Sequence, residues 1–188
     1  MEIYPLTSDR WQDLTSLFGE RGANSGCWCM WWRLSSKEFS QGNASNKSAF
    51  KELVDTGRVP GLLAYLDGKP VGWVSVAPRQ EFGRLERSPN YRAVDSLPVW
   101  SIVCFYIDRT CRKRGVAAKL LQAAVQFAVE KGAQVVEAYP RPTGQGRSSS
   151  SDLYTGTLDM FLAAGFQEVE RRAPNRPIVR LTPDPKTN

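Results

Sequence analysis

Hydrophobic residues recur at helical spacing most clearly between residues 116 and 129. The apolar positions of this stretch are Val116, Ala117, Leu120, Leu121, Ala124, Val125, Ala128 and Val129. They share one stripe of a helix, and that stripe must face a core. Lys131 and Gly132 follow, a basic residue and a glycine as expected at a helix C-terminus. The pattern predicts an amphipathic helix that ends at Gly132.

Shorter apolar runs predict strands on both sides of that helix. Residues 99–107 are almost entirely apolar, as in a strand that is buried on both faces, and residues 134–139 form a second run. A helix between two strands is the connection that joins parallel neighbours. Upstream, the runs 62–66 and 71–76 surround Asp67-Gly68, which is a strong hairpin signal.

The rest of the pattern completes an order in which strands and helices alternate. Further strands are predicted at residues 2–6, 166–171 and 178–181, and further helices from Thr7 or Ser8 to Phe18, from Ser45 or Asn46 to Val54, and over residues 158–162. Polar stretches at residues 35–48, 78–98 and 141–152 are predicted to be loops. This order predicts a mixed α/β fold, with a central sheet of about seven strands flanked by about four helices.

Composition narrows the function further. The chain has 188 residues, of which 41% are hydrophobic and 23% charged, so we predict a single domain over residues 1–188 with a frayed tail at residues 182–188. There is no histidine, which excludes Ser-His-Asp and Cys-His nucleophiles and metal sites that need imidazole. The net charge of +6 suits an anionic partner such as a phosphorylated cofactor, nucleic acid or a membrane surface.

The cysteines and the N-terminus bear on the cell compartment. Cys27, Cys29, Cys104 and Cys111 fit neither a disulfide scaffold nor a common zinc motif, so we expect reduced thiols that pack in the protein and no metal. We find no apolar signal stretch near the N-terminus and no run long enough to span a membrane. The expectation is a soluble cytoplasmic protein.

The segment from Ile107 to Ala118 carries the most chemistry. A buried strand runs into a cationic turn, which opens the amphipathic helix, and the cations are Arg109, Arg112, Lys113 and Arg114. Gly115 lets the backbone approach a ligand closely. The first helical N–H groups have no intrahelical partner and favour anions. By themselves these residues fit a pyrophosphate site and a packing glycine beside a solvated basic turn about equally well.

The spacing in this segment resembles the acyl-CoA signature of the GNAT superfamily of N-acyltransferases. In that signature a strand-end aliphatic residue precedes Arg or Gln, two residues, Gly, one residue, and Gly or Ala; here the positions are Ile107, Arg112, Gly115 and Ala117. The order of elements is also similar, and the resemblance is specific from about Gly61 to Leu181. It implies a single GNAT-like acetyltransferase domain.

The resemblance implies how the substrates bind. The co-substrate would be acetyl-CoA, a coenzyme A thioester, with its pantetheine arm along Phe105, Tyr106 and Ile107. The cofactor phosphates would lie on Arg112, Lys113, Arg114, Gly115, Val116, Ala117 and Ala118. Strands 99–107 and 134–139 would splay to admit the thioester. A primary amine, a small molecule rather than a protein, would then attack it directly.

The sequence indicates less clearly which residues would act as the general acid and the general base of the transfer. Where the family often has a tyrosine that protonates the leaving thiolate, this chain has Phe161, and where the family often has an asparagine, it has Tyr154. Tyr154 is therefore either a displaced acid or a packing residue. Glu137 interrupts an apolar strand and is either a partly buried general base or an ion-paired structural residue. Glu81 and Glu86, in the long loop, are further candidates for the base.

Several alternatives stay open at this level. Trp28, Trp31 and Trp32 either line the acceptor pocket or cover the core. The chain could be an acyl-CoA sensor or scaffold without transferase activity, which Phe161 favours. A nucleic-acid binder would use the basic segments 79–92 and 109–114, but no nucleic-acid motif accompanies them. The sequence leaves open the acceptor, the acyl chain, and whether the chain is a monomer or a homodimer.

Overall fold

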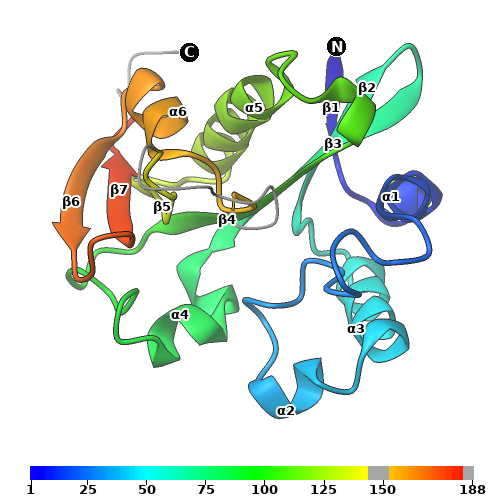
Figure 1. The fold of residues 1–188 in the computed structure, drawn as a ribbon, viewed down its shortest axis with the longest axis horizontal. Coiled ribbons are helices and arrows are strands. Elements are labelled where there is room, and N and C mark those ends of the chain that lie inside the picture. The colour runs from blue at the N-terminus through cyan, green and yellow to red at the C-terminus, as the bar shows by residue number, and fades with distance from the viewer. Residues whose placement is uncertain (144–152, 184–188) are drawn as a thin grey trace.

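The computed structural model describes residues 1–143 and 153–183, and its centre is a seven-stranded sheet (Figure 1). The strands are β1 Glu2–Pro5, β2 Gly61–Leu66, β3 Lys69–Pro78, β4 Trp100–Ile107, β5 Val136–Ala138, β6 Gln167–Arg171 and β7 Pro177–Leu181. They lie in the order β1-β2-β3-β4-β5-β7-β6. Strands β4 and β5 pair in parallel, whereas the other neighbours are antiparallel. The predicted mixed α/β fold is confirmed.

Helices cover both faces of the sheet. Those in the described residues are α1 Trp11–Phe18, α2 Ser36–Phe39, α3 Asn43–Asp55, α4 Gly83–Arg87, α5 Val116–Glu130 and α6 Leu158–Ala163. Figure 1 shows α5 and α6 on one side and the other helices on the opposite side. The alternation of strand residues explains this arrangement, since Leu62 and Val74 pack with α5 while Leu63 and Trp73 pack with α1 and α3.

Two segments predicted as loops contain helices, so the prediction of about four helices was too low. Helix α2 begins with a capping box, in which Glu38 N–H donates to the Ser35 hydroxyl and Ser35 N–H donates to the Glu38 carboxylate. Helix α4 is a single turn anchored by the fully buried Leu85. Both lack the long apolar stripe on which helix prediction depends.

Helix α3 begins earlier than predicted. It starts at Asn43, with Gly42 as its N-cap, rather than at Ser45 or Asn46. The side chain of Asn46 is buried, and its Nδ2 donates to the carbonyl of Gly26 at 2.9 Å. Asn46 therefore ties the helix to the preceding loop instead of capping the helix.

The sheet opens between β4 and β5. These strands pair only from Trp100 to Ile102, after which β5 ends and β4 continues to Ile107. The segment before α6 enters this opening, where the amide of Phe105 donates to the carbonyl of Tyr154 at 2.6 Å. The splay creates space beside the C-terminal half of β4, as the sequence analysis expected.

Some predictions fall partly outside the described residues. Residues 144–152 of the predicted loop 141–152 and residues 184–188 of the predicted tail are among these. Across residues 1–143 and 153–183, none of the helices combines the length and the apolar character that a bilayer crossing requires. The same residues contain no group of three or more His, Cys, Asp or Glu side chains that could hold a metal ion.

Candidate active site

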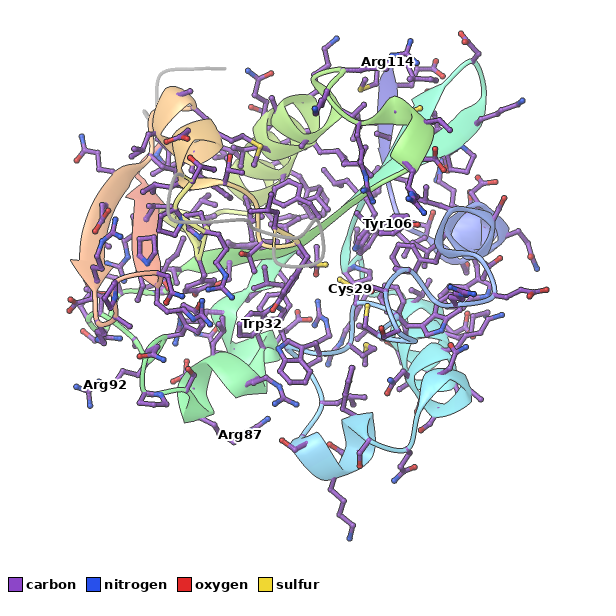
Figure 2. The ribbon with its side chains drawn as sticks, viewed as in Figure 1. Cys29, Trp32, Arg87, Arg92, Tyr106 and Arg114 are labelled. Atoms are coloured by element: carbon purple, nitrogen blue, oxygen red, sulfur yellow. The ribbon has the colours of Figure 1, made fainter. Side chains whose placement is uncertain are left out.

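A cleft of about 660 Å³ lies between the C-terminal end of β4, the start of α5 and the segment before α6. It contains nine of the ten residues predicted to bind the cofactor: Phe105, Tyr106, Ile107, Arg112, Lys113, Gly115, Val116, Ala117 and Ala118. Arg114 does not line it, and Figure 2 shows Arg114 at the outer edge of the molecule. The fold thus brings the predicted set together around one cavity.

The turn between β4 and α5 presents backbone N–H groups to the cleft. Lys113 and Gly115 both have left-handed backbones, with φ of +60° and +75°, and such turns gather N–H groups into an anion-binding concavity. Among the described residues, nothing accepts a hydrogen bond from the amides of residues 112–118, and Gly115 provides no side-chain cap. The first amide of this region with a partner is that of Lys119, which bonds to the carbonyl of Gly115 at 3.1 Å. Within the described part of the chain these seven amides therefore have no acceptor, as a phosphate site on this turn would require.

Asp108 holds the turn in this conformation. Its carboxylate accepts hydrogen bonds from the amide of Thr110 at 2.8 Å and from the Thr110 hydroxyl at 2.5 Å. These bonds, the hydroxyl one first, lower the pKa of Asp108, so the carboxylate stays ionised. On the other side of the turn, Arg112 Nε donates to the carbonyl of Ile107 at 3.2 Å. The protein's own hydrogen bonds therefore hold this turn on both sides.

A second cavity, of about 320 Å³, adjoins the cleft, and we call it the aromatic pocket. Both cavities are lined by Ala23, Asn24, Phe105, Tyr106 and Tyr154. The other residues around the aromatic pocket are Phe18, Ser25, Cys27, Cys29, Trp31, Trp32, Phe39 and Cys104. None of these described lining residues carries a formal charge at neutral pH. Figure 2 shows Trp32, Cys29 and Tyr106 at the centre of the molecule.

The tryptophans of the Cys27–Arg33 segment have two different roles, since two of them line the pocket and one covers the core. Trp31 and Trp32 line the aromatic pocket. Trp28 is instead a core residue, with 1% of its surface exposed, and it packs with Trp11 and Phe18. The segment therefore both covers the core and shapes the pocket.

Two cysteines of the pocket wall interact, which the sequence did not indicate. Cys29 Sγ accepts a hydrogen bond from Trp73 Nε1 at 3.2 Å. Burial opposes ionisation of Cys29, but the polar groups beside its thiol, Cys104 first and then Trp73 and Ser75, outweigh it and lower the pKa of the thiol. The neighbouring Cys29 thiol, followed by burial, raises the pKa of Cys104 well above its usual value. These residues meet because β3 and β4 pair next to the loop that carries Cys29.

Comparison with known families agrees with this geometry. The model of the acetyltransferase (GNAT) family matches residues 27–148, which are more than half of the chain. The chain belongs to the GNAT acetyltransferase family. The match includes the whole Cys27–Arg33 segment and the whole turn between β4 and α5.

Solved GNAT structures share the fold along nearly the whole chain. PaiA N-acetyltransferase from Thermoplasma acidophilum, in complex with coenzyme A, has a TM-score of 0.56 at 14% identity, over 97% of this chain and 98% of that one. A polyamine N-acetyltransferase from Drosophila melanogaster reaches 0.57 at 13% identity, over 97% and 99%. An aminoglycoside N-acetyltransferase bound to CoA reaches 0.57 at 18% identity, over 92% and 91%. At such identities the likeness shows the fold alone. A search of curated proteins found no match.

The position where GNAT enzymes often carry a tyrosine acid is part of the core here. Phe161 is fully buried and stacks edge-on against Phe105 and Phe166, with ring centroids 6.1 and 5.1 Å apart. Tyr154 instead lines both the cleft and the aromatic pocket. Burial raises the pKa of Tyr154, so its phenol stays protonated and can donate a hydrogen bond.

The backbone contact of Tyr154 changes the expected pairing of the pantetheine arm. The amide of Phe105 already donates to the carbonyl of Tyr154, so it is not free for an added strand as the structure stands. Alternate amides of a strand point to opposite sides. Because the amide of Asp108 donates to Val71 on β3, the amide of Ile107 points away from β3, toward the cleft. Pairing at Ile107 remains available.

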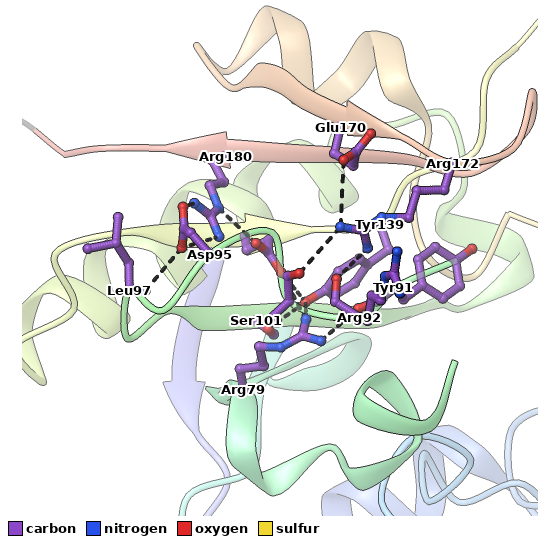
Figure 3. A network of polar contacts seen from close by, with 12 residues as sticks. Arg79, Tyr91, Arg92, Asp95, Leu97, Ser101, Tyr139, Glu170, Arg172 and Arg180 are labelled. Carbon is purple, nitrogen blue, oxygen red and sulfur yellow. Dashed lines mark hydrogen bonds and ion pairs between the residues drawn. The ribbon is translucent and has the colours of Figure 1, made fainter. Parts of the chain in front are cut away.

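Glu137 lies apart from both cavities. It is fully buried and accepts hydrogen bonds from Arg79 Nη1 at 3.0 Å, the Tyr139 hydroxyl at 2.6 Å and Arg180 Nε at 2.7 Å. Figure 3 shows Arg79, Tyr139 and Arg180 within this polar network. It lines neither the cleft nor the aromatic pocket. Both of its carboxylate oxygens are engaged, an arrangement that fits the structural alternative better than a general base.

The two glutamates of the long loop are also ion-paired. Glu81 pairs with Arg33 at 2.5 Å, and Glu86 pairs with Arg79 at 2.7 Å. Neither lines the cleft or the aromatic pocket. Of the predicted acid–base candidates, the fold therefore brings Tyr154 to the junction of the two cavities and leaves the glutamates elsewhere.

Proposed function

We propose that this chain is an N-acetyltransferase that moves an acetyl group from acetyl-CoA to a primary amine. The observation that carries the proposal is the row of amides at residues 112–118, which have no partner among the described residues and lie at one end of a cleft that leads to the aromatic pocket. Arg109, Arg112 and Lys113 line the same cleft and add positive charge where a pyrophosphate would lie. Family membership and the CoA-bound neighbours support this assignment.

The two cavities separate the substrates in a way that suits direct transfer. The thioester would lie at their junction, beside Phe105 and Tyr154, and the amine would enter from the aromatic pocket. The neutral nitrogen attacks the carbonyl carbon, the C–N bond forms and the C–S bond breaks. Coenzyme A leaves as a thiolate, which takes up the proton that the amine releases, directly or through water. Tyr154 would donate a hydrogen bond to the departing sulfur.

The nucleic-acid alternative receives less support from the basic segment 79–92. Arg79 is buried in the network around Glu137. Arg84 donates hydrogen bonds to the carbonyls of Trp31 and Leu34. These cations are engaged within the protein, whereas binding of a phosphate backbone needs accessible ones.

Calorimetric titration with acetyl-CoA, together with thiol release in the presence of amines, tests the proposal. We expect a dissociation constant within the range of about 1 μM to 1 mM that is usual for enzyme substrates. Amine-dependent release of the free thiol would show transfer, and saturable binding without release would favour the sensor alternative. An absence of binding up to about 1 mM acetyl-CoA would contradict the proposed function.

Tyr154→Phe is expected to lower kcat by roughly 10–100-fold, because a hydrogen bond to a charged group contributes roughly 1.5–3 kcal/mol. The dissociation constant for acetyl-CoA should change little, since the backbone contact with Phe105 does not need the hydroxyl. Steady-state kinetics and calorimetry measure the two quantities. Tyr91→Phe removes another buried hydroxyl outside both cavities and should keep wild-type turnover. An unchanged kcat in Tyr154→Phe would exclude this role.

A further inference from the structure

The walls of the aromatic pocket include three pairs of neighbouring rings. Trp31 and Phe39 lie edge to face at a centroid distance of 5.1 Å, and Phe18 and Tyr106 do so at 5.4 Å. Trp32 and Tyr154 are tilted at 6.4 Å. The rings come from α1, the segment before α2, α2 itself, β4 and the segment before α6, so they face the cavity from several elements. Such walls suit the faces and edges of another aromatic ring.

Positive charge lies close behind these rings. The guanidinium of Arg84 sits over one face of the Trp31 ring, 3.7 Å from its centroid, so this ring already contacts one cation. Arg33 packs over the ring of Phe82 at 4.5 Å, and among the described residues its Nε and Nη2 have no hydrogen-bond partner. Glu81, the carboxylate that pairs with Arg33, is also approached by Arg58 at 4.0 Å. The surroundings of the pocket therefore disfavour a second positive charge.

The unpartnered polar side chain of the wall points to the same class of ligand. Trp32 is 4% exposed, and its Nε1, a donor, finds no partner among the described residues. An ammonium group has only donors and cannot pair with it, whereas the face of a ligand's aromatic ring can accept a weak N–H···π contact. The volume of about 320 Å³ is near the lower end of the range of small-molecule sites, about 300–1,000 Å³.

We propose that the amine acceptor is a small arylalkylamine, with one aromatic ring and a single primary amine on a short chain, rather than a polyamine or an aminoglycoside. This inference rests on the proposed transferase function, because the bound amine is an acceptor only if the chain transfers an acetyl group. The ring fills the aromatic pocket, and the nitrogen reaches the junction beside Phe105 and Tyr154. Transfer into these apolar, positively charged surroundings favours the neutral form of the amine, which is the nucleophile. The pocket thereby performs part of the work of a general base.

Direct binding of two matched amines tests the inference. We expect 2-phenylethylamine to bind at least about tenfold more tightly than 1,4-diaminobutane, because burial of the ring contributes favourably and the second ammonium gains no partner. Calorimetry with the full chain measures both affinities, with and without CoA. If the diamine binds equally or more tightly, or if 2-phenylethylamine does not bind up to about 10 mM, the inference is overturned.

A charge placed in the pocket provides a matched comparison. Ser25 lines the pocket with a left-handed backbone, φ +51°, which Asp and Asn tolerate. Ser25→Asp should reduce the ratio of the dissociation constants of 1,4-diaminobutane and 2-phenylethylamine by about fivefold, which is the effect of a partly exposed ion pair. Ser25→Asn should leave this ratio unchanged. An equal preference in both variants would show that the pocket does not select by charge. If the Asp variant does not fold, the wild-type comparison of the two amines decides.

The same samples separate this inference from the proposed function. If acetyl-CoA binds but the diamine is the better ligand, the acceptor class is wrong and the transferase assignment stands. If 2-phenylethylamine binds and acetyl-CoA does not, the pocket selects arylalkylamines but the transferase assignment fails.

Discussion

Gly115→Glu is expected to weaken acetyl-CoA binding by about 100-fold or more. The new carboxylate would lie at the first turn of α5, where the unpartnered amides of residues 112–118 would otherwise receive the pyrophosphate. Two like charges about 4 Å apart repel by about 4 kcal/mol at an effective dielectric constant of 20. Part of that energy is lost to salt screening, which leaves the expected factor of about 100. Calorimetric titration measures the change.

The control for this variant must separate charge from backbone strain. A Cβ added at position 115 meets none of the described atoms within 4 Å, but the φ of +75° costs a non-glycine residue about 1–2 kcal/mol. Gly115→Asn also places a side chain on the left-handed backbone but adds no charge. Asn tolerates that backbone conformation better than most residues. Both variants should unfold cooperatively in urea, and the Asn variant should keep most of the affinity for acetyl-CoA. Wild-type affinity in Gly115→Glu would remove the phosphate site from this turn.

The turn and its helix could be predicted because their determinants are local. The stripe of α5 is a periodic pattern within fifteen residues, and its observed bounds, Val116–Glu130, match the predicted helix closely. The glycine and the cations that precede it are adjacent in the chain. The same holds for the hairpin at Asp67-Gly68, where β2 and β3 pair as expected. Short-range spacing therefore predicted the part of the cleft that α5 and the end of β4 form.

The aromatic pocket could not be predicted in the same way. Its lining combines Phe18 of α1, Trp31 of the following segment, Cys104 of β4 and Tyr154 of the segment before α6, which only the folded sheet brings together. The interaction of Cys29 with Cys104 has the same origin. Sequence spacing alone left the role of the tryptophans undecided, because both a core residue and a pocket residue are large and apolar. The start of helix α2, by contrast, could have been predicted, because its Ser35–Glu38 capping box is visible in the sequence.

Glu137→Ala is expected to lower the free energy of unfolding by about 3–5 kcal/mol, because removal of one partner leaves buried charges uncompensated. Arg79 and Arg180 would lose the carboxylate that now accepts their hydrogen bonds at 3.0 and 2.7 Å. Arg79 is 5% exposed and keeps only the more exposed Glu86 as an acidic partner. Urea denaturation measures the loss. Glu168→Ala removes a surface ion pair with Arg171 instead and should cost at most about 1 kcal/mol.

Glu137→Gln distinguishes the structural role from a catalytic one. Glutamine can still accept hydrogen bonds from Arg79 and Tyr139, so this variant should be more stable than Glu137→Ala. If Glu137 supports the fold, kcat of the folded Gln variant should fall by no more than about threefold, and its pH–rate profile should keep its shape. The network approaches the aromatic pocket through Tyr139 and Tyr91, whose rings lie 6.4 and 5.7 Å from that of Trp32. A loss of turnover of about 100-fold or more, with the acidic limb of the pH profile removed, would instead identify Glu137 as the base. In that case, a proton path of some length would have to connect the buried carboxylate to the amine.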